Sequence, residues 1–152
     1  MARTGAIMAD LPSIPYGFQQ RLPGTTLDAA VEQVGSALAK EGFGVLTKID
    51  VKDTLKQKLG VDVLPYVILG ACNPTLAHQA IAVEPQIGLL LPCNIVIREV
   101  SEGDVVVSIT DPRALFATVN NPRLAPVVDD VERRLRRVMR TLVTTEDARN
   151  RS

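Results

Sequence analysis

Residues 94–110 read NIVIREVSEGDVVVSIT, and this stretch decides the fold class of the 152-residue chain. Val and Ile dominate both halves, as is typical of strands, and the Ser101-Glu102-Gly103-Asp104 sequence between them is typical of a turn. The pattern therefore predicts a hairpin with one strand over Asn94–Val100 and a second over Val105–Thr110. A hairpin pairs its two strands antiparallel, so we expect at least part of the sheet to be antiparallel.

The rest of the chain supplies three further strands and two long helices. The predicted strands are Tyr16–Leu22, Phe43–Ile49 and Val63–Cys72. One helix begins after Thr25 or Thr26 and runs to about Lys40, and the other runs from about Pro126 to Val143; both repeat apolar residues at helical spacing. This order predicts an α+β fold, in which an antiparallel sheet packs against two long helices.

Three short helices are expected, two between strands and one after the last strand, because a capping side chain precedes each predicted start. Asp50 caps 51–59, Asn73 with Pro74 opens a helix to about Val83, and Asp111 with Pro112 opens another to about Val119. The organisation expected is a flexible tail over 1–15, a single domain over 16–143 and a polar tail over 144–152.

Composition excludes several classes of protein. Hydrophobic residues make up 46% and charged residues 22%, so the chain is not disordered in bulk. The net charge is zero and aromatics are 3%, which argues against a nucleic-acid partner. No apolar run approaches a membrane span, and no secretory signal is visible. We expect a cytoplasmic protein with reduced thiols, and two Cys with one His cannot complete an all-Cys/His four-ligand metal site.

The strongest candidate site is a doubled dipeptide. Cys72-Asn73 ends one predicted strand, and Pro92-Cys93-Asn94 begins another. If Cys72 pairs opposite Cys93, two thiols and two amides meet at one end of the sheet. In a second possible register the later strand starts at Ile87, and the sulfurs then lie several residues apart. The sequence leaves both registers open.

Each candidate residue also has a purely structural interpretation. Cys72 precedes a helix start, where amide groups favour a thiolate, but both Cys are also common core residues. Asp111 either lines a pocket beside the sheet edge or only caps a helix, and His78 is expected to face solvent. The arginines of the last helix are expected to form its solvated face, with acidic partners one turn away.

Four blocks of the sequence resemble a family found in bacteria and archaea, domain of unknown function 302. The blocks are residues 41–47 with 49–52, then 66–74, 87–94 and 111–112, in that order, and the resemblance covers about 16–143. It implies a TATA-binding-protein-like fold of β-α-β(4)-α topology and homodimers. It implies no activity and no cofactor, since fold does not determine function.

Three functional interpretations follow. The first is a small homodimeric cytosolic binding module of unknown ligand, with its site formed by Cys72, Asn73, Pro92, Cys93, Asn94 and Asp111. The second is a thiol-dependent redox enzyme, or a soft-metal protein, that uses Cys72 and Cys93. The third is a structural interaction protein without a pocket. The apolar stretches Val63–Cys72 and Ile87–Leu91 exceed what two helices readily cover, which independently predicts a homodimer.

Overall fold

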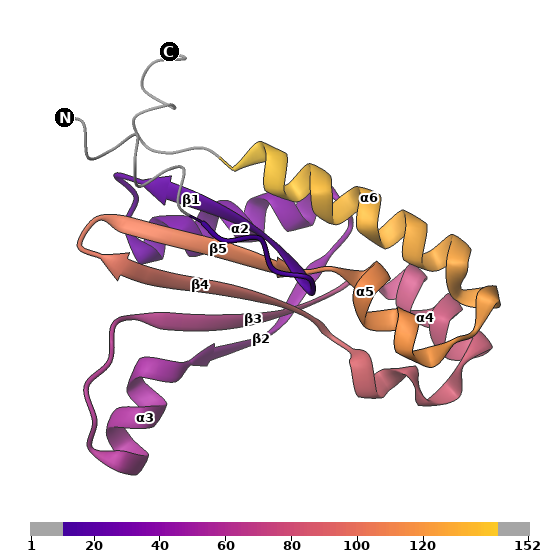
Figure 1. Ribbon diagram of the computed structural model, residues 1–152, viewed down its shortest axis with the longest axis horizontal. Coiled ribbons are helices and arrows are strands. Elements are labelled where there is room, and N and C mark those ends of the chain that lie inside the picture. Colours follow the sequence, from indigo (N-terminus) through magenta and orange to yellow (C-terminus); the bar gives the residue numbers. More distant parts are fainter. Residues whose placement is uncertain (1–10, 143–152) are drawn as a thin grey trace.

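A computed structural model describes residues 11–142 of the chain, and its five strands form one antiparallel sheet (Figure 1). The sheet order is β1-β5-β4-β3-β2. The strands are β1 (Gly17–Pro23), β2 (Gly44–Asp50), β3 (Tyr66–Cys72), β4 (Cys93–Ser101) and β5 (Asp104–Thr110). The α-helices are α2 (Leu27–Lys40), α3 (Val51–Leu59), α4 (Pro74–Val83), α5 (Pro112–Phe116) and α6 (Ala125–Thr141). Three 3-10 segments complete the fold: η1 (Pro85–Leu90), η2 (Ala117–Val119) and η3 (Pro122–Leu124).

The predicted α+β class is confirmed, and so is the strand–helix–four strands–helix order. The hairpin forms between β4 and β5, with Ser101 paired to Asp104 across the turn. Of the predicted tails, residues 1–10 and 144–152 lie outside the described residues, as does Val143 at the predicted end of the last helix. Residues 11–15 contain neither helix nor strand.

The core lies between one face of the sheet and the helices α2 and α6. Alternation along each strand brings every second side chain to this covered face, which we call the inner face. Its buried residues on the central strands are Val67, Leu69, Ala71, Cys93, Ile95, Ile97, Val105, Val107 and Ile109. The apolar stripe predicted for the last helix packs onto them, and Leu135 and Val138 are fully buried. The opposite, outer face carries no long helix (Figure 1).

One predicted boundary is wrong, and so is one of the alternatives that the sequence left open. Strand β3 begins at Tyr66, three residues later than predicted, because Pro65 cannot donate a backbone hydrogen bond and Val63 and Leu64 lie exposed before it. The apolar stretch 87–91 is not a strand: most of it belongs to η1, which begins at Pro85, and only Ile87 in that segment is buried. Pro85 suits the first position of a helical turn, so this stretch is helical although its apolar composition is also typical of a strand.

Residues 44–66, which we call the β2–α3 segment, contain no buried residue. Strand β2 forms the edge of the sheet, and α3 projects from it on the side away from α2 and α6 (Figure 1). Asp50 caps α3 by accepting from the amide of Asp53, as predicted, and Gly60 ends the helix with a φ of 69°. The segment is therefore formed by local signals rather than by core packing.

The charged face of α6 is paired as predicted. Arg134 bonds Asp130 at 2.8 Å and Arg136 bonds Glu132 at 3.0 Å, both one turn away, while Arg137 reaches Glu41 at the end of α2. Arg134 and Arg136 are therefore neutralised within α6, and Arg137 links α6 to the end of α2. Between residues 11 and 142, no helix combines the length and apolarity needed to cross a membrane.

Candidate functional site

Strands β3 and β4 bring the two predicted dipeptides to the same end of the sheet. Their register differs from both registers considered from the sequence. Cys93 pairs opposite Ala71, and Asn94 pairs opposite Gly70. The register is one residue away from a Cys72–Cys93 pair, and the alternative that began the later strand at Ile87 is wrong because those residues are helical. Since directly opposed residues share a face, Cys93 lies on the inner face with Ala71, and Cys72 ends β3 one residue beyond that pair.

A small, half-open cavity lies at this end of the sheet. It has a volume of about 20 Å³ and is bordered by β3, β4, α4, α5 and α6. Its lining residues are Phe43, Ala71, Cys72, Asn73, Leu76, Ala77, Ala80, Leu91, Cys93, Phe116, Val127 and Val131. Three of the six predicted site residues, Cys72, Asn73 and Cys93, thus border one apolar space.

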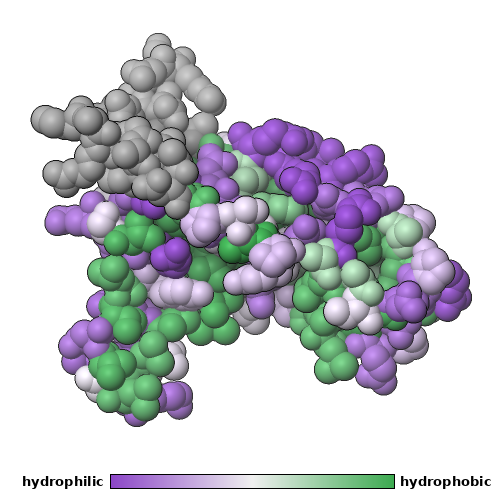
Figure 2. All heavy atoms as spheres, viewed as in Figure 1, coloured by the Kyte–Doolittle hydropathy of each residue, from purple (hydrophilic) through white to green (hydrophobic). Residues whose placement is uncertain are grey.

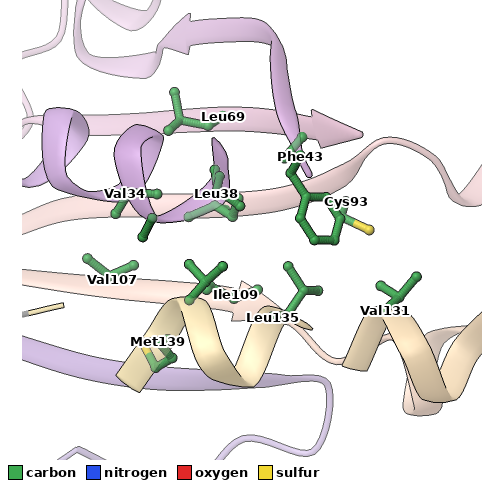
Figure 3. Close-up of a cluster of buried hydrophobic side chains, with 14 of the residues drawn as sticks. Val34, Leu38, Phe43, Leu69, Cys93, Val107, Ile109, Val131, Leu135 and Met139 are labelled. Atoms are coloured by element: carbon green, nitrogen blue, oxygen red, sulfur yellow. The ribbon is translucent and has the colours of Figure 1, made fainter. Parts of the chain in front are cut away.

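Cys93 is part of the wall and is 6% exposed. Figure 3 shows its side chain beside the ring of Phe43, on the side of the sheet that faces α6. Burial, and then the neighbouring Cys72, raise the pKa of the Cys93 thiol from 9.0 to about 11. The group is therefore a neutral thiol at neutral pH, and it acts as a polarisable apolar surface rather than as a nucleophile.

Asn73 is buried and joins three helices. Its Oδ1 accepts from the amide of Leu76 at 3.2 Å, which caps α4 as predicted. Its Nδ2 donates to the backbone oxygen of Glu41 at 3.4 Å, and Arg134 donates to that same oxygen at 2.9 Å. The amide thereby ties α4 to the end of α2 and, through the shared carbonyl, to α6, so both ends of the Asn73 side chain are engaged in structure.

Asn94 and Pro92 belong to the other side of the sheet. Asn94 is exposed beside Gly70 on the outer face. A Cβ on Gly70 would overlap Thr47 Oγ1 and would lie 2.7 Å from Cγ of Pro92, so these two side chains close over the glycine. The Leu91–Pro92 peptide is cis. The outer face at this end therefore presents the polar groups of Thr47 and Asn94, apart from the apolar cavity.

Asp111 and His78 do not join the cavity. Asp111 Oδ1 accepts from the amide of Arg113 at 3.0 Å and caps α5, which agrees with the structural interpretation. His78 is exposed, as predicted. Within residues 11–142, no group of three or more His, Cys, Asp and Glu side chains is placed to hold a metal ion, and both Cys are free.

The sequence analysis missed most of the cavity wall, because apolar residues in predicted helices read only as core. The two aromatic members, Phe43 and Phe116, carried a usable signal. The chain has only three Phe. Phe43 directly follows the helix-to-strand connection marked by Glu41-Gly42, and Phe116 ends the short helix that Asp111-Pro112 opens. Aromatic rings at such junctions are suited to closing the end of a sheet.

Comparison with known proteins gives a family and a similar solved structure. The family model described as "Domain of unknown function DUF302" matches residues 18–142. The crystal structure of an uncharacterized conserved protein DUF302 from Bacillus stearothermophilus is similar with a TM-score of 0.76 and 29% sequence identity. The similarity covers 84% of this chain and 98% of that one. The comparison with curated proteins gives no match.

Proposed function

The chain belongs to the family of domain of unknown function DUF302, and from that premise we propose that it is a small homodimeric binding module whose site is the cavity bordered by Cys72, Asn73 and Cys93. The observation that carries the proposal is the convergence of these three residues on one half-open apolar space. A sheet end closed by helices is a usual place for a ligand pocket.

The volume of the cavity limits the size of the chemical group that can bind inside it. About 20 Å³ is the space of one water molecule, and the wall offers almost no polar group that such a water needs. The cavity therefore suits a methyl-sized apolar terminus, with the remainder of the ligand outside the mouth beside Cys72, Ala77 and Leu91, which are all half-buried. The chemical class we propose is a molecule with an unbranched aliphatic end.

The thiol-dependent alternative has weaker support from the geometry. A redox pair or a soft-metal site needs both sulfurs on one side, with access for the reactant or ion. The β3–β4 register pairs Cys93 with Ala71 instead of Cys72, and the raised pKa of Cys93 disfavours its thiolate. A role for Cys72 alone at the mouth is compatible with the binding module.

The third interpretation, an interaction protein without a ligand pocket, is supported by a different observation. The exposed β2–α3 segment is far larger than the cavity mouth. We keep this as the second candidate function. Residence in the cytosol, where both thiols stay reduced, and kinship with the TATA-binding-protein-like fold remain predictions from the sequence.

Nuclear magnetic resonance with short alcohols tests the cavity directly. We expect n-butanol to shift the backbone amide signals of Ala77 and Cys93 saturably, and tert-butanol, whose branched end exceeds the space, to leave them unchanged. Ala77→Leu fills the cavity from α4 and should abolish the n-butanol shifts. Ala82→Leu, at an exposed position of the same helix, is the matched control and should retain them.

Equal, non-saturable shifts with both alcohols would contradict the binding proposal. Retention of the n-butanol response in Ala77→Leu would place the binding elsewhere and would also contradict it.

A further inference from the structure

The β2–α3 segment is an apolar surface that nothing in the described chain covers. Along its 23 residues, 44–66, every residue from 44 to 50 and from 56 to 64 is exposed. Its large hydrophobic members are Val45, Leu46, Ile49, Leu59, Val61, Val63 and Leu64, which are 36% to 69% exposed. Figure 2 shows hydrophobic side chains gathered over the projection formed by α3 and the chain beside it. Contiguous exposed apolar surface of this kind marks contact sites.

The segment holds its own shape without the core. Lys52 Nζ donates to the backbone oxygen of Val63 at 2.8 Å and ties α3 to the returning chain. Lys56 pairs with Asp62 at 3.1 Å, and Gln57 donates to Asp53 at 2.8 Å. A surface ordered by local bonds, with its apolar side chains turned outward, is preorganised for association because little further ordering is needed on binding.

The segment also carries an unpaired sheet edge. Strand β2 pairs only with β3, so the backbone groups on its other side have no strand partner. The bulge between Val45 and Thr47 leaves 47–50 regular. The opposite edge is different, because β1 ends in Pro23, which lacks an amide hydrogen, and the side-chain amide of Gln19 holds the preceding chain at Pro12 beside β1. Of the two edges, β2 is the one open to another strand.

We propose that a second copy of this chain occupies the β2–α3 segment, with the β2 strands of the two copies paired antiparallel about a two-fold axis. The sheets then join into one ten-stranded sheet, and each α3 packs near the partner's edge. This inference rests on the homodimer of the proposed function and names its interface. A two-fold axis closes such a pair, because each copy offers the same surface to the other.

Two quantities favour a second copy over a different protein. The segment's 23 residues, most of them exposed, fall within the roughly 20–30 residues per partner of a stable interface of ordinary size. Its charges nearly cancel, with four Lys (48, 52, 56 and 58) and three Asp (50, 53 and 62), so two identical surfaces do not repel each other. A heterologous partner selected by charge would need a surface of one sign.

The first experiment measures mass in solution by light scattering. We expect wild type at micromolar concentration to give twice 16.4 kDa, and Leu46→Asp, which places a carboxylate on the β2 edge, to give 16.4 kDa. Leu89→Asp is the matched control, because Leu89 is 85% exposed but lies in η1, and it should remain a dimer. Circular dichroism checks that each variant is folded. A monomeric wild type would overturn both the homodimer and this interface.

The second experiment locates the axis by cysteine scanning in a Cys72→Ser background. Opposed residues of antiparallel strands have Cα atoms about 4.5–5.5 Å apart, within the range of a disulfide. Only the residue at the two-fold axis lies opposite its own copy, so of the single cysteines placed at 46, 47, 48 and 49 we expect one to give an efficient intersubunit disulfide. Gln19→Cys on β1 is the control and should give none.

A wild-type dimer that stays dimeric in Leu46→Asp and gives no cross-link at any of these four positions would refute this interface while leaving the proposed homodimer in place. The alcohol titration of the cavity is independent of both outcomes.

Discussion

Gly42 is the position where one substitution tests both a helix boundary and the network around the candidate site. Its φ is 83°, in the left-handed region, at the end of α2. A Cβ built there would lie 2.9 Å from Nδ2 of the buried Asn73 and 3.5 Å from Nη1 of Arg134. Valine would therefore be strained by its backbone and would displace the amide that caps α4.

The two effects add to a measurable loss. A β-branched residue at positive φ costs about 1–2 kcal/mol, and loss of a capping side chain costs about 1 kcal/mol. We expect Gly42→Val to lower the free energy of unfolding by about 2–3 kcal/mol. For a chain of this length, that corresponds to a decrease in Tm of roughly 5–10 °C.

Calorimetry on three variants separates the contributions. Gly103→Val has a φ of 73° with no atom within 4 Å of the added Cβ, so it reports backbone strain alone and should lose about 1–2 kcal/mol. Gly35→Ala lies inside α2 with open space around it and should be neutral or up to about 1 kcal/mol more stable. If Gly42→Val and Gly103→Val melt alike, the contact with Asn73 has no energetic role; if Gly42→Val is as mild as Gly35→Ala, the helix boundary itself is wrong.

Three further predictions concern the same end of the molecule and the helix α6. The pKa of Cys93 in the folded protein is raised from 9.0 to about 11, so only the unfolded chain loses this proton between pH 9 and pH 11. The free energy of unfolding should therefore fall by roughly 2–3 kcal/mol as the pH rises from 9 to 11. Denaturant unfolding of Cys93→Ala should show a smaller loss of stability over the same pH range. Burial raises the pKa of Glu132, but hydrogen bonds from Arg113 and Arg136 outweigh it, and the net pKa is lowered. The stability that the ionised Glu132 contributes is therefore present above pH 4.5 and is lost as the pH falls. The Tm of Glu132→Gln should decline less in acid than that of wild type. Gly70→Ala should destabilise by about 1–3 kcal/mol through overlap with Thr47 and Pro92, and urea unfolding should show that Thr47→Ala restores part of the loss, whereas additive losses would contradict the predicted overlap.

Most of the fold could be predicted because its signals are local. Alternating β-branched residues around Gly103 are sufficient for the hairpin, and the side chains of Asp50, Asn73 and Asp111 mark helix starts wherever they precede one. The expectations that failed lie next to prolines. Pro65 and Pro85 lack an amide hydrogen and have a fixed φ, which disfavours a strand at these positions. The apolar composition around both prolines favours a strand, so the sequence pattern alone gives conflicting signals there.

The candidate site could be predicted only in part, because it depends on the register between two strands. Only one of the two registers that the sequence left open put Cys72 and Cys93 at one sheet end, and the observed register differs from it by one residue. A shift of one residue changes the face of a side chain, and the residues of the two strands do not by themselves determine that shift. Here the register follows from η1 and from Pro92, which set where β4 enters the sheet beside Gly70. The cavity wall came from five elements far apart in sequence, so no single motif contained it.

The sheet order has a consequence for how the chain is made. Strands β1 and β2 are synthesised first but occupy the two outer edges, and the three strands between them come later in sequence. When a ribosome has released the first 60 residues, β1, α2 and β2 have emerged without any strand to pair with. Gly17 of β1 pairs with Thr110 of β5, which lies 93 residues further along the chain. Strand β2 can pair as soon as β3 emerges, whereas β1 pairs only with β5, so the first strand of the chain is the last to join the sheet.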